Sequence, residues 1–551
     1  MDRSSIGRLV LMAALAFLLF QFGPKLFGGG KPEVQPLGGV ESQAILAANP
    51  RAEEQFCDIR TAEFHAQISN RGAAVRHFEL LLPKYQTAGK PIDLSTTPDQ
   101  EFFRQLRFDF DNTAGLPPGK EWNVGANLVD WKLDSSNGQS CVFSFRNEQV
   151  ELKKTLSATG RPYELAVDAT ITNLAPRPLY HALTVHSDAW RTTKDVKGSM
   201  FRQSPLVTRV ECVLRDGKPH RLGESDFSAG KFSDGEHFFK STVNRGEWYQ
   251  TPGNPEFIAV SNAYFAHAVA TVKSPTTPVC QMLVEERRGA NPDEDGAMYR
   301  TRLAYPGLDL APGASASYSV LGYMGPKERS VLAAAGGGNH RFSELIDLGF
   351  FSIIAKVLVG FLLKVHSIIP NWGVAIIILT ITARTLLFPL TVPGIKGMIK
   401  MRELKPEIDA MNEKFKDDPQ AKGLAQMELW RKHNVNPIKG CLPQMASMPV
   451  WFALYTTLQT AVELYHIPFL WLPDLSSADP LFILPFIIGT TSFFQQRLMP
   501  QQGDAAQQKM MQYLMPAMFT VFMLFLPAGL GVYMFTNGVL GILQQQAVEW
   551  H

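Results

Sequence analysis

The sequence predicts a polytopic α-helical membrane protein that carries a large all-β domain outside the cytoplasm. Long uncharged runs lie before Pro24 or after Asp347. Between them about 320 residues are polar, enough for a domain with its own core, and apolar residues there often alternate with polar ones. The mean hydropathy of -0.05 is typical of a soluble protein, so this average conceals a hydrophobic C-terminal third. A net charge of +2 gives no reason to expect nucleic-acid binding.

The first predicted element is a transmembrane anchor over residues 1–24. Its uncharged stretch follows Arg3 and Arg8 and precedes Lys25, and no small-x-small cleavage site is nearby. We therefore expect an uncleaved anchor whose N-terminus the arginines hold inside the cell. Residues 25–55, rich in Gly, Pro and Ala, follow as a tether on the outer side.

Residues 56–343 are predicted to form an antiparallel β-sandwich. Two alternating runs carry its inward-facing residues: Phe64, Ala66 and Ile68 in the first, and Tyr163, Leu165, Val167, Ala169 and Ile171 in the second. Turns such as Asn70-Arg71-Gly72 separate the strands. This segment has no nucleophile motif, Gly-rich phosphate loop or recognisable carboxylate pair, so we expect no catalytic residue and no enzyme activity.

The five cysteines are widely spaced and form neither a C-x-x-C motif nor a Cys/His ligand pattern, so no metal or other cofactor is expected. Four of them fall in the β-rich domain: Cys57, Cys141, Cys212 and Cys280. Outside the cytoplasm they could form one or two disulfides, but the sequence does not reveal the pairing. Cys441 lies at a membrane boundary, where a packing role is expected.

The next two elements follow from a parity argument. Two spans within residues 344–392 would place the ten Lys and Arg of residues 396–439 on the outer side, against the positive-inside tendency. One span returns them to the cytoplasm. We therefore expect an amphipathic helix at the outer interface over 344–370 and a transmembrane helix over 371–392.

The remaining uncharged runs predict four more spans. The final run, Met510 to Val548, is about twice the length needed to cross a bilayer, so it should fold back at Leu526-Pro527-Ala528-Gly529. The predicted spans are 440–463, 480–498, 510–527 and 528–548, with a cytoplasmic loop at 499–509. The total is six spans, one anchor and a cluster of five, with both termini inside.

The cytoplasmic segment 393–439 has a helical pattern. Its apolar residues at 3-4-3-4 spacing are Met401, Leu404, Ile408, Met411 and Phe415. Asp417-Asp418-Pro419 breaks this helix, and a second one follows over Ala421 to His433, which predicts an antiparallel hairpin. The hairpin is either a solvated loop or an adaptable, Met-rich contact for a partner or an incoming chain.

Arg384 is the only formally charged residue in the interior of the five clustered spans, since Glu463 and Arg497 lie at the ends of theirs. Burying it costs several kcal/mol unless it meets water, a partner or lipid headgroups, and no Asp or Glu lies inside another span. A hydrated cavity open to the cytoplasm would satisfy it, whereas a snorkelling arginine that only fixes helix depth is the alternative. Polar residues available to line such a cavity are Thr380, Gln444, Gln459, Gln495, Gln496, Thr536 and Asn537.

Short motifs around these spans resemble the YidC membrane-protein insertases of bacterial inner membranes. They are Asn371-Trp372-Gly373, the run ending at Arg384, Phe388-Pro389-Leu390-Thr391, Asn436 to Gln444, Met448 to Tyr455, Leu526 to Leu530, and Gln544-Gln545-Gln546. The likeness is specific over residues 350–546 and weaker across the anchor and the β-rich domain. The resemblance implies a chaperone and insertase with a five-helix core, acting alone or with the Sec translocon, and a β-domain that is a supersandwich without catalysis.

The resemblance also implies the site. It makes Arg384 the positive charge of a hydrophilic groove open to the cytoplasm and lipid, and it makes the hairpin necessary for insertion. The expected groove residues are Arg384, Thr380, Tyr533 and Met534, which the resemblance implies, together with Gln444 and Thr536 from the polar residues named above. Many relatives carry a second aromatic where this chain has Met534.

The partners that the resemblance implies are nascent membrane proteins, the Sec translocon, the lipid bilayer and the ribosome, at the bacterial inner membrane. The chain ends at His551 without the long basic tail that some relatives use at the ribosome. The alternatives are a small-solute transporter that uses Arg384 as an anion site, and a membrane-tethered carbohydrate binder.

Overall fold

The structure is a computed structural model. It describes residues 35–36, 53–87, 89–98, 103–111, 131–197, 204–217, 219–228, 232–233, 240–241, 248–288, 295–349, 351–415, 418–433, 450, 452–498 and 510–550. The predicted anchor 1–24, most of the tether, Cys441, Gln444 and the loop 499–509 lie outside these residues.

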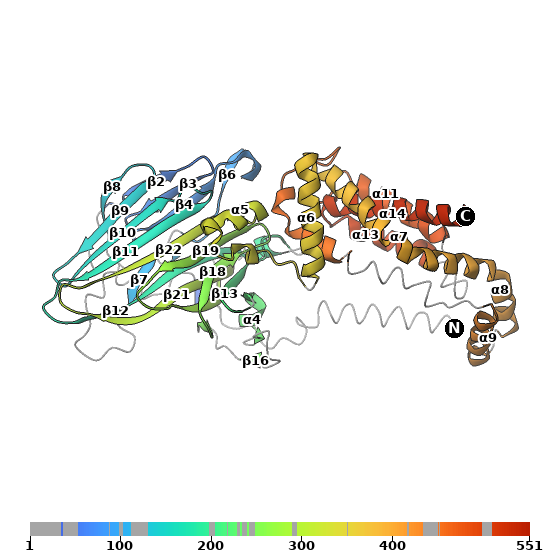
Figure 1. Ribbon diagram of the computed structural model, residues 1–551, viewed down its shortest axis with the longest axis horizontal. Helices are drawn as coiled ribbons and strands as arrows, with labels where there is room; N and C mark the ends of the chain where they lie inside the picture. Colours follow the sequence, from blue (N-terminus) through green and yellow to red (C-terminus); the bar gives the residue numbers. More distant parts are fainter. Residues whose placement is uncertain are drawn as a thin grey trace.

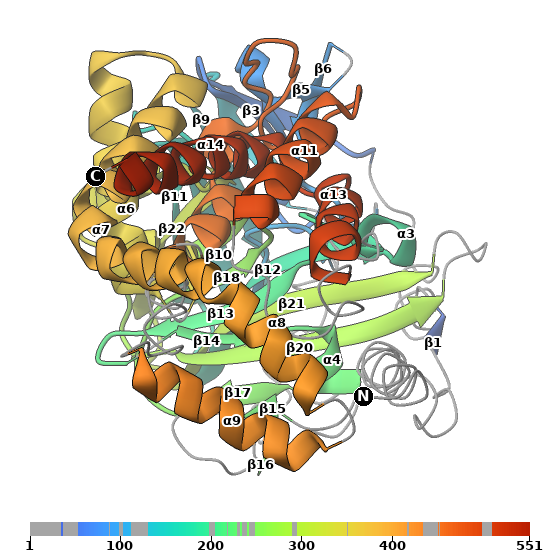
Figure 2. The same ribbon diagram turned by 90° about the vertical axis from the view of Figure 1, so that its right-hand side faces the viewer.

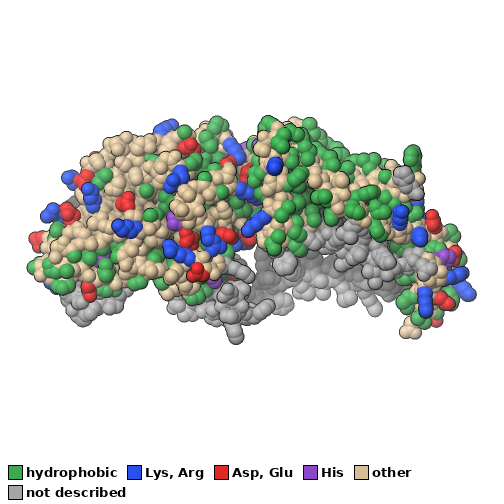
Figure 3. Space-filling view, in the orientation of Figure 1, with side chains coloured by type: hydrophobic (Ala, Val, Ile, Leu, Met, Phe, Trp, Pro, Cys, Tyr) green, Lys and Arg blue, Asp and Glu red, His purple; other side chains and the backbone are tan. Residues whose placement is uncertain are grey.

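The described chain forms a β-rich part and a helical part that follow one another along the long axis (Figure 1). Helices α8 and α9 lie at the end of the helical part farthest from the sheets (Figure 1). Hydrophobic side chains cover most of the helical surface in Figure 3, whereas charged side chains gather on the β-rich part and at the far tip. An apolar surface between two charged ends, as on this face, is typical of a membrane-embedded body.

Two large sheets form the β-rich domain. The nine-stranded sheet has the order β14 (Pro219–Leu222), β13 (Arg209–Leu214), β18 (Pro255–Ser261), β19 (Phe265–Lys273), β22 (Ser315–Pro326), β11 (Glu164–Asn173), β10 (Val150–Ala158), β9 (Ser140–Arg146) and β8 (Lys132–Ser136). The six-stranded sheet has the order β1 (Gln35–Pro36), β20 (Val279–Arg288), β21 (Gly296–Leu310), β12 (Leu179–Thr192) and β7 (Phe108–Asp111), with β17 (Tyr249–Thr251) also paired to β20. The two sheets pack face to face through contacts such as those of β13 with β20 and of β12 with β18.

Smaller elements complete this domain. A five-stranded sheet has the order β2 (Phe56–Arg60), β3 (Phe64–Ser69), β4 (Ala74–Leu80), β6 (Lys90–Asp93) and β5 (Gln86–Thr87). The ribbon β15 (Phe232–Ser233) and β16 (Lys240–Ser241) stands apart from it. The short helices are η1 (Pro83–Tyr85), α3 (Thr193–Val196), α4 (Glu224–Ser228), α5 (Arg329–Ala334), η5 (Ala335–Gly338) and η6 (Phe342–Leu345).

The predicted sandwich is confirmed, together with the inward faces of its two alternating runs. Phe64, Ala66 and Ile68 on β3 are fully buried. Leu165, Val167, Ala169 and Ile171 of β11, with Tyr163 directly before the strand, are at most 2% exposed. They belong to one continuous core with residues of the other sheets, which explains why the alternation is strict here.

Two disulfides connect different sheets. Cys57 of β2 pairs with Cys141 of β9, and Cys212 of β13 pairs with Cys280 of β20. The sequence left both the number and the pairing open, because partners 84 and 68 residues apart meet only through the sheet order. All four sulfur atoms are buried, so the bridges lie inside the sandwich.

The helical part contains α6 (Ser352–Ile368), α7 (Trp372–Glu403), α8 (Lys405–Lys414), α9 (Pro419–Lys432), the helical residues 452–460, η7 (Val462–Leu464), α11 (Ile483–Leu498), η8 (Met510–Leu514), α13 (Met515–Met523) and α14 (Ala528–Trp550). The fold-back predicted at Leu526 to Gly529 lies where α13 has ended and α14 begins. Among the described helices, one is long and apolar enough to span a membrane, over Trp372–Pro389. The count of six spans therefore stays a prediction.

Two predicted boundaries need correction. The interfacial helix begins at Ser352 rather than at residue 344, because the preceding turn η6 buries Phe342 and Leu345 in the core of the β-rich domain. The helix expected to end near residue 392 continues to Glu403 through Pro389 and Pro393. A proline removes one backbone donor, and neighbouring helices in a membrane protein compensate for that loss.

The hairpin forms as predicted, but its apolar seam faces inward. Met401, Leu404 and Ile408 are at most 9% exposed and pack with Met411 and Leu429. The seam is therefore largely internal to the hairpin, and the adaptable contact, one of the two alternatives for this segment, stays a prediction. The exposed apolar side chains are instead Leu424 (65%) and Met427 (57%) of α9.

The two parts of the chain meet at a mixed polar and aromatic junction. The Arg329 backbone amide donates to Glu463 at 3.1 Å and its guanidinium donates at 2.7 Å, and both side chains are largely buried. Tyr465, next along the chain, packs against Tyr264 and Tyr85 of the β-rich domain. The junction thus attaches the segment after residues 452–460 to the sandwich.

We expect a double-mutant cycle on Arg329→Ala and Glu463→Ala to give a coupling energy of about 1–3 kcal/mol in unfolding of the full chain. Both side chains are shielded from solvent, so dissolved salt reduces their interaction energy little. The exposed pair Arg209–Asp347, at 3.1 Å, is the control and should give less than about 1 kcal/mol. Equal couplings for the two pairs would contradict a specific role for Glu463.

Candidate functional site

Arg384 lies on α7, about 18 Å along the helix from Trp372 at a rise of about 1.5 Å per residue. The helix starts where the Asn371 side chain accepts a hydrogen bond from the Val374 amide at 3.1 Å. The side chain of Arg384 is half-buried. Helix α14 lies between α7 and α11 and contacts both (Figure 2). The Arg384 guanidinium faces α14, because it donates a hydrogen bond to Asn537 of that helix.

Three hydrogen bonds hold the guanidinium. Nε of Arg384 donates to Asn537 Oδ1 at 2.7 Å, Nη2 donates to the Asn537 carbonyl at 2.9 Å, and Nη1 donates to Gln544 Oε1 at 3.1 Å. We expected water to satisfy this charge, because no span offered a carboxylate. Amide and carbonyl oxygens of α14 provide three acceptors, and two of them belong to Asn537, which was among the polar residues expected to line the cavity.

The partners of Arg384 lie on one face of α14. Tyr533, Asn537, Gly541 and Gln544 follow one another at intervals of four, four and three residues, which places them on the same side of the helix. A Cβ atom at Gly541 would lie 3.1 Å from both Arg384 Nη2 and Gln495 Nε2, so glycine provides the space for the guanidinium. We call Arg384, Gln495, Asn537, Gly541 and Gln544 the Arg384 cluster.

Sequence reasoning identified Arg384, Gln495 and Asn537 but missed Gly541 and the role of Gln544. Gln544 entered only as part of a motif. The signal that could have found them is the shared helical face, since polar or small residues at such spacing in an uncharged run mark a buried polar stripe.

The structure places the other predicted site residues differently. Thr380 is fully buried, and its hydroxyl donates to the Ile376 carbonyl at 2.7 Å, so it presents no accessible polar surface. Tyr533 is 6% exposed, whereas Met534 and Thr536 are half-buried. Gln459 lies apart from Arg384 and donates to the Tyr455 hydroxyl at 2.7 Å.

A hydrophobic cluster occupies the side of Arg384 that faces the β-rich domain. Leu379 of α7 and Leu530 and Tyr533 of α14 belong to it, one or two helical turns before Arg384 and Asn537. At the other end of the two helices, Arg402 and Glu549 form an ion pair. The Arg384 cluster is thus separated from the β-rich domain by packed apolar side chains.

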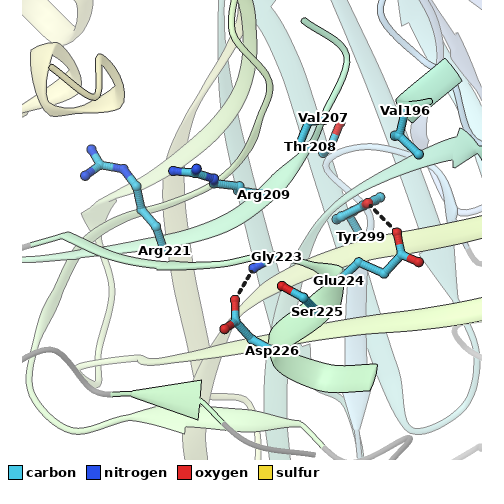
Figure 4. Close-up of a pocket in the computed structure, with 10 residues that line it drawn as sticks. All are labelled: Val196, Val207, Thr208, Arg209, Arg221, Gly223, Glu224, Ser225, Asp226 and Tyr299. Atoms are coloured by element: carbon cyan, nitrogen blue, oxygen red, sulfur yellow. Dashed lines mark hydrogen bonds between the residues drawn. The ribbon is translucent and has the colours of Figure 1, made fainter. Parts of the chain in front are cut away.

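A second feature with charged lining is a cavity of about 620 Å³ in the β-rich domain (Figure 4). Arg209 and Arg221 lie on one side of it, and Glu224 and Asp226 lie on the other (Figure 4). Burial, together with the nearby Glu286, raises the pKa of Glu224, whose carboxylate accepts a hydrogen bond from the Tyr299 hydroxyl at 3.4 Å.

The other charged groups of this cavity have structural partners. Arg221 donates to Glu211 at 2.9 Å, Arg209 donates to Asp347, and Asp226 accepts from the Gly223 amide at 2.8 Å. These contacts stabilise the local fold, and the cavity lies in the β-rich domain, apart from the Arg384 cluster.

Comparison with known proteins covers nearly the whole chain. The family described as "60Kd inner membrane protein" matches residues 364–550, and the family described as "YidC periplasmic domain" matches residues 57–361. A "Membrane protein insertase YidC" of Anaeromyxobacter dehalogenans is 34% identical over 521 residues, which is 91% of this chain and 86% of the relative. The protein of that name from Geotalea daltonii is 30% identical, over 100% of this chain and 99% of the relative.

Solved structures are more distant. A crystal structure described as an active YidC insertase with its first transmembrane domain resolved covers 98% of this chain and 99% of its own, at 17% identity and a TM-score of 0.36. A putative aldose 1-epimerase from Escherichia coli K12 covers 49% of this chain and 99% of its own, at 13% identity and a TM-score of 0.32.

Proposed function

The chain belongs to the YidC family of membrane protein insertases, and we propose that its Arg384 cluster receives the polar flank of an incoming membrane segment. The protein is an inner-membrane insertase with a periplasmic domain, and its substrates are nascent membrane proteins. Family membership favours this function over the solute transporter that the sequence left open. The observation that carries the proposal is a half-buried guanidinium held by uncharged groups within an apolar helical body.

The proposed mechanism lowers the cost of moving a polar flank into the membrane. A hydrophobic segment with a short acidic flank approaches from the cytoplasm, and the flank moves toward Arg384, which attracts its carboxylates. A positive charge and polar groups partway into the bilayer shorten the distance over which the flank loses hydration. The apolar segment then moves sideways into lipid, driven by its own burial.

We propose the membrane arrangement that this mechanism requires. The periplasmic domain defines one side, so the hairpin at the opposite end lies on the cytoplasmic side (Figure 1). Helix α6 runs across the long axis, which supports a position at the outer membrane surface with Lys356 and Lys364 near lipid headgroups (Figure 1). Apolar residues packed before Arg384 support a groove closed toward the periplasm, and six spans would place both termini inside.

The hairpin and the remaining partners belong to the same proposal. Leu424 and Met427 on α9 offer exposed, adaptable contacts for an incoming chain at the cytoplasmic end. Cooperation with the Sec translocon and with the ribosome follows from the family resemblance and stays a prediction.

Site-specific crosslinking tests the proposal. We expect a photoreactive residue at Thr536 or Met534, on α14 within three residues of the Arg384 partner Asn537, to crosslink to a ribosome-bound nascent membrane protein with an acidic flank. The control is Leu386, which is 73% exposed and points away from Arg384, since two residues along a helix correspond to about 200°. If Leu386 crosslinks as efficiently as Thr536, the chain enters along the lipid-facing side and the proposed site is wrong.

A further inference from the structure

Every hydrogen-bond partner of the Arg384 guanidinium among the described residues is uncharged. The acceptors are the side chain and carbonyl of Asn537 and the side chain of Gln544, all from α14. The Gln544 amide in turn donates to the Arg384 carbonyl at 3.4 Å, so the two residues bind each other reciprocally. The contacts fix the orientation of the guanidinium without cancelling its charge.

The acidic groups of the surrounding helices do not neutralise Arg384 within the described part of the chain. On α14 the single carboxylate is Glu549, which pairs with Arg402, and on α7 it is Glu403, at the end of the helix. Helices α11 and α13 contain no acidic residue. The net positive charge therefore remains available in a partly dehydrated place, where it attracts an anion more strongly than in water.

The hydrogen-bond count shows what kind of anion fits. A guanidinium has five N–H donors, and the three bonds use one donor on each nitrogen. Within the described part of the chain, one N–H on Nη1 and one on Nη2 remain without an acceptor. A carboxylate accepts two such donors at once in a bidentate pair, and this geometry is specific for planar oxyanions.

We propose that Asn537 and Gln544 are positioning residues that hold Arg384 oriented and un-neutralised, so that it binds one carboxylate of an acidic flank through its two terminal nitrogens. The inference rests on the proposed function, and it explains why uncharged amide side chains rather than carboxylates contact Arg384. Gly541 allows the arrangement, because a side chain there would contact the guanidinium. An aspartate or glutamate in place of either amide would keep the shape and supply an internal counter-ion.

The experiment uses Asn537→Asp and Gln544→Glu in the full-length protein, reconstituted in vesicles. The substrates are two single-span proteins that differ only in an acidic or an uncharged N-terminal flank. We expect each variant to lower the ratio of acidic-flank to uncharged-flank insertion by about tenfold. The new carboxylate forms an ion pair with Arg384, so the carboxylate of the substrate loses its charge-assisted hydrogen bonds to the guanidinium. Gln512→Glu on η8, a residue outside the Arg384 cluster, makes the same amide-to-acid change and should leave the ratio unchanged.

The outcomes separate the inference from the proposed function. If both variants keep the wild-type ratio while Arg384→Ala lowers it, the neutral-amide inference is wrong and the proposed function stands. If Arg384→Ala also keeps the ratio, the proposed function itself fails. An equal loss for both substrates would show that the amides only support the fold, which likewise overturns the inference. Using two independent variants guards against one that does not fold.

Discussion

Replacing Arg384 by alanine should slow insertion of a single-span protein with an acidic N-terminal flank by at least about tenfold, and Arg384→Glu should slow it further. Alanine removes the charge and the two donors that a carboxylate would use. Glutamate also repels the flank, and it cannot donate to Asn537 and Gln544, which then lose their partner. The measurement is protease protection of the substrate's outer flank in reconstituted vesicles.

Lys396→Ala is a matched control for this prediction. Lys396 is an exposed cation on the same helix α7, three turns closer to its C-terminal end, and it belongs to no part of the Arg384 cluster. Its loss should change the rate by less than about twofold, as is usual for an exposed charge. Wild-type insertion rates for both Arg384→Ala and Arg384→Glu would refute the role of this charge.

Removing the Cys57–Cys141 disulfide should destabilise the periplasmic domain by about 4–5 kcal/mol, because the bridge closes a loop of about 85 residues in the unfolded chain. The bridge joins β2 to β9, so its loss also removes the covalent connection between the five-stranded and the nine-stranded sheet. We expect Cys57→Ser/Cys141→Ser to lower the urea midpoint of the β-sheet circular dichroism signal in the full-length protein.

Two comparisons make the disulfide prediction specific. Cys441→Ser, outside both bridges, should leave the midpoint unchanged. A reducing agent should lower the midpoint of the wild-type protein more than that of the double variant, because the variant retains only Cys212–Cys280. A double variant as stable as the wild type would show that sheet packing alone holds β2 against β9.

Much of the fold follows from local pattern. The alternation of Phe64, Ala66 and Ile68 places each residue on the correct face, since a strand has a side-chain period of two. Asp418 at the start of α9 accepts bonds from two backbone amides, as expected from a capping residue before a proline. The order of strands was not predictable, because β19 lies beside β22 and β12 beside β21 through contacts far apart in sequence.

The candidate site divides in the same way. Arg384 was identifiable because a charge in a long uncharged run is costly, and Asn537 was among its expected neighbours. Thr380 was expected to line a groove, yet its hydroxyl donates a hydrogen bond within its own helix. The direction of this hydroxyl depends on how α7 packs against its neighbours. Gln544 and Gly541 became partners of Arg384 only once α14 was placed beside α7.

The sequence by itself determined the membrane character of the C-terminal third, the sandwich class of the domain before it, and the one charge that membrane burial makes expensive. These are consequences of hydropathy, periodicity and charge, which act along neighbouring residues. The tertiary structure alone decided the disulfide pairs, the inward direction of the hairpin seam, and the uncharged amides that hold Arg384. Those depend on which distant segments pack together, and the free energy of such packing is shared among contacts that no local pattern records.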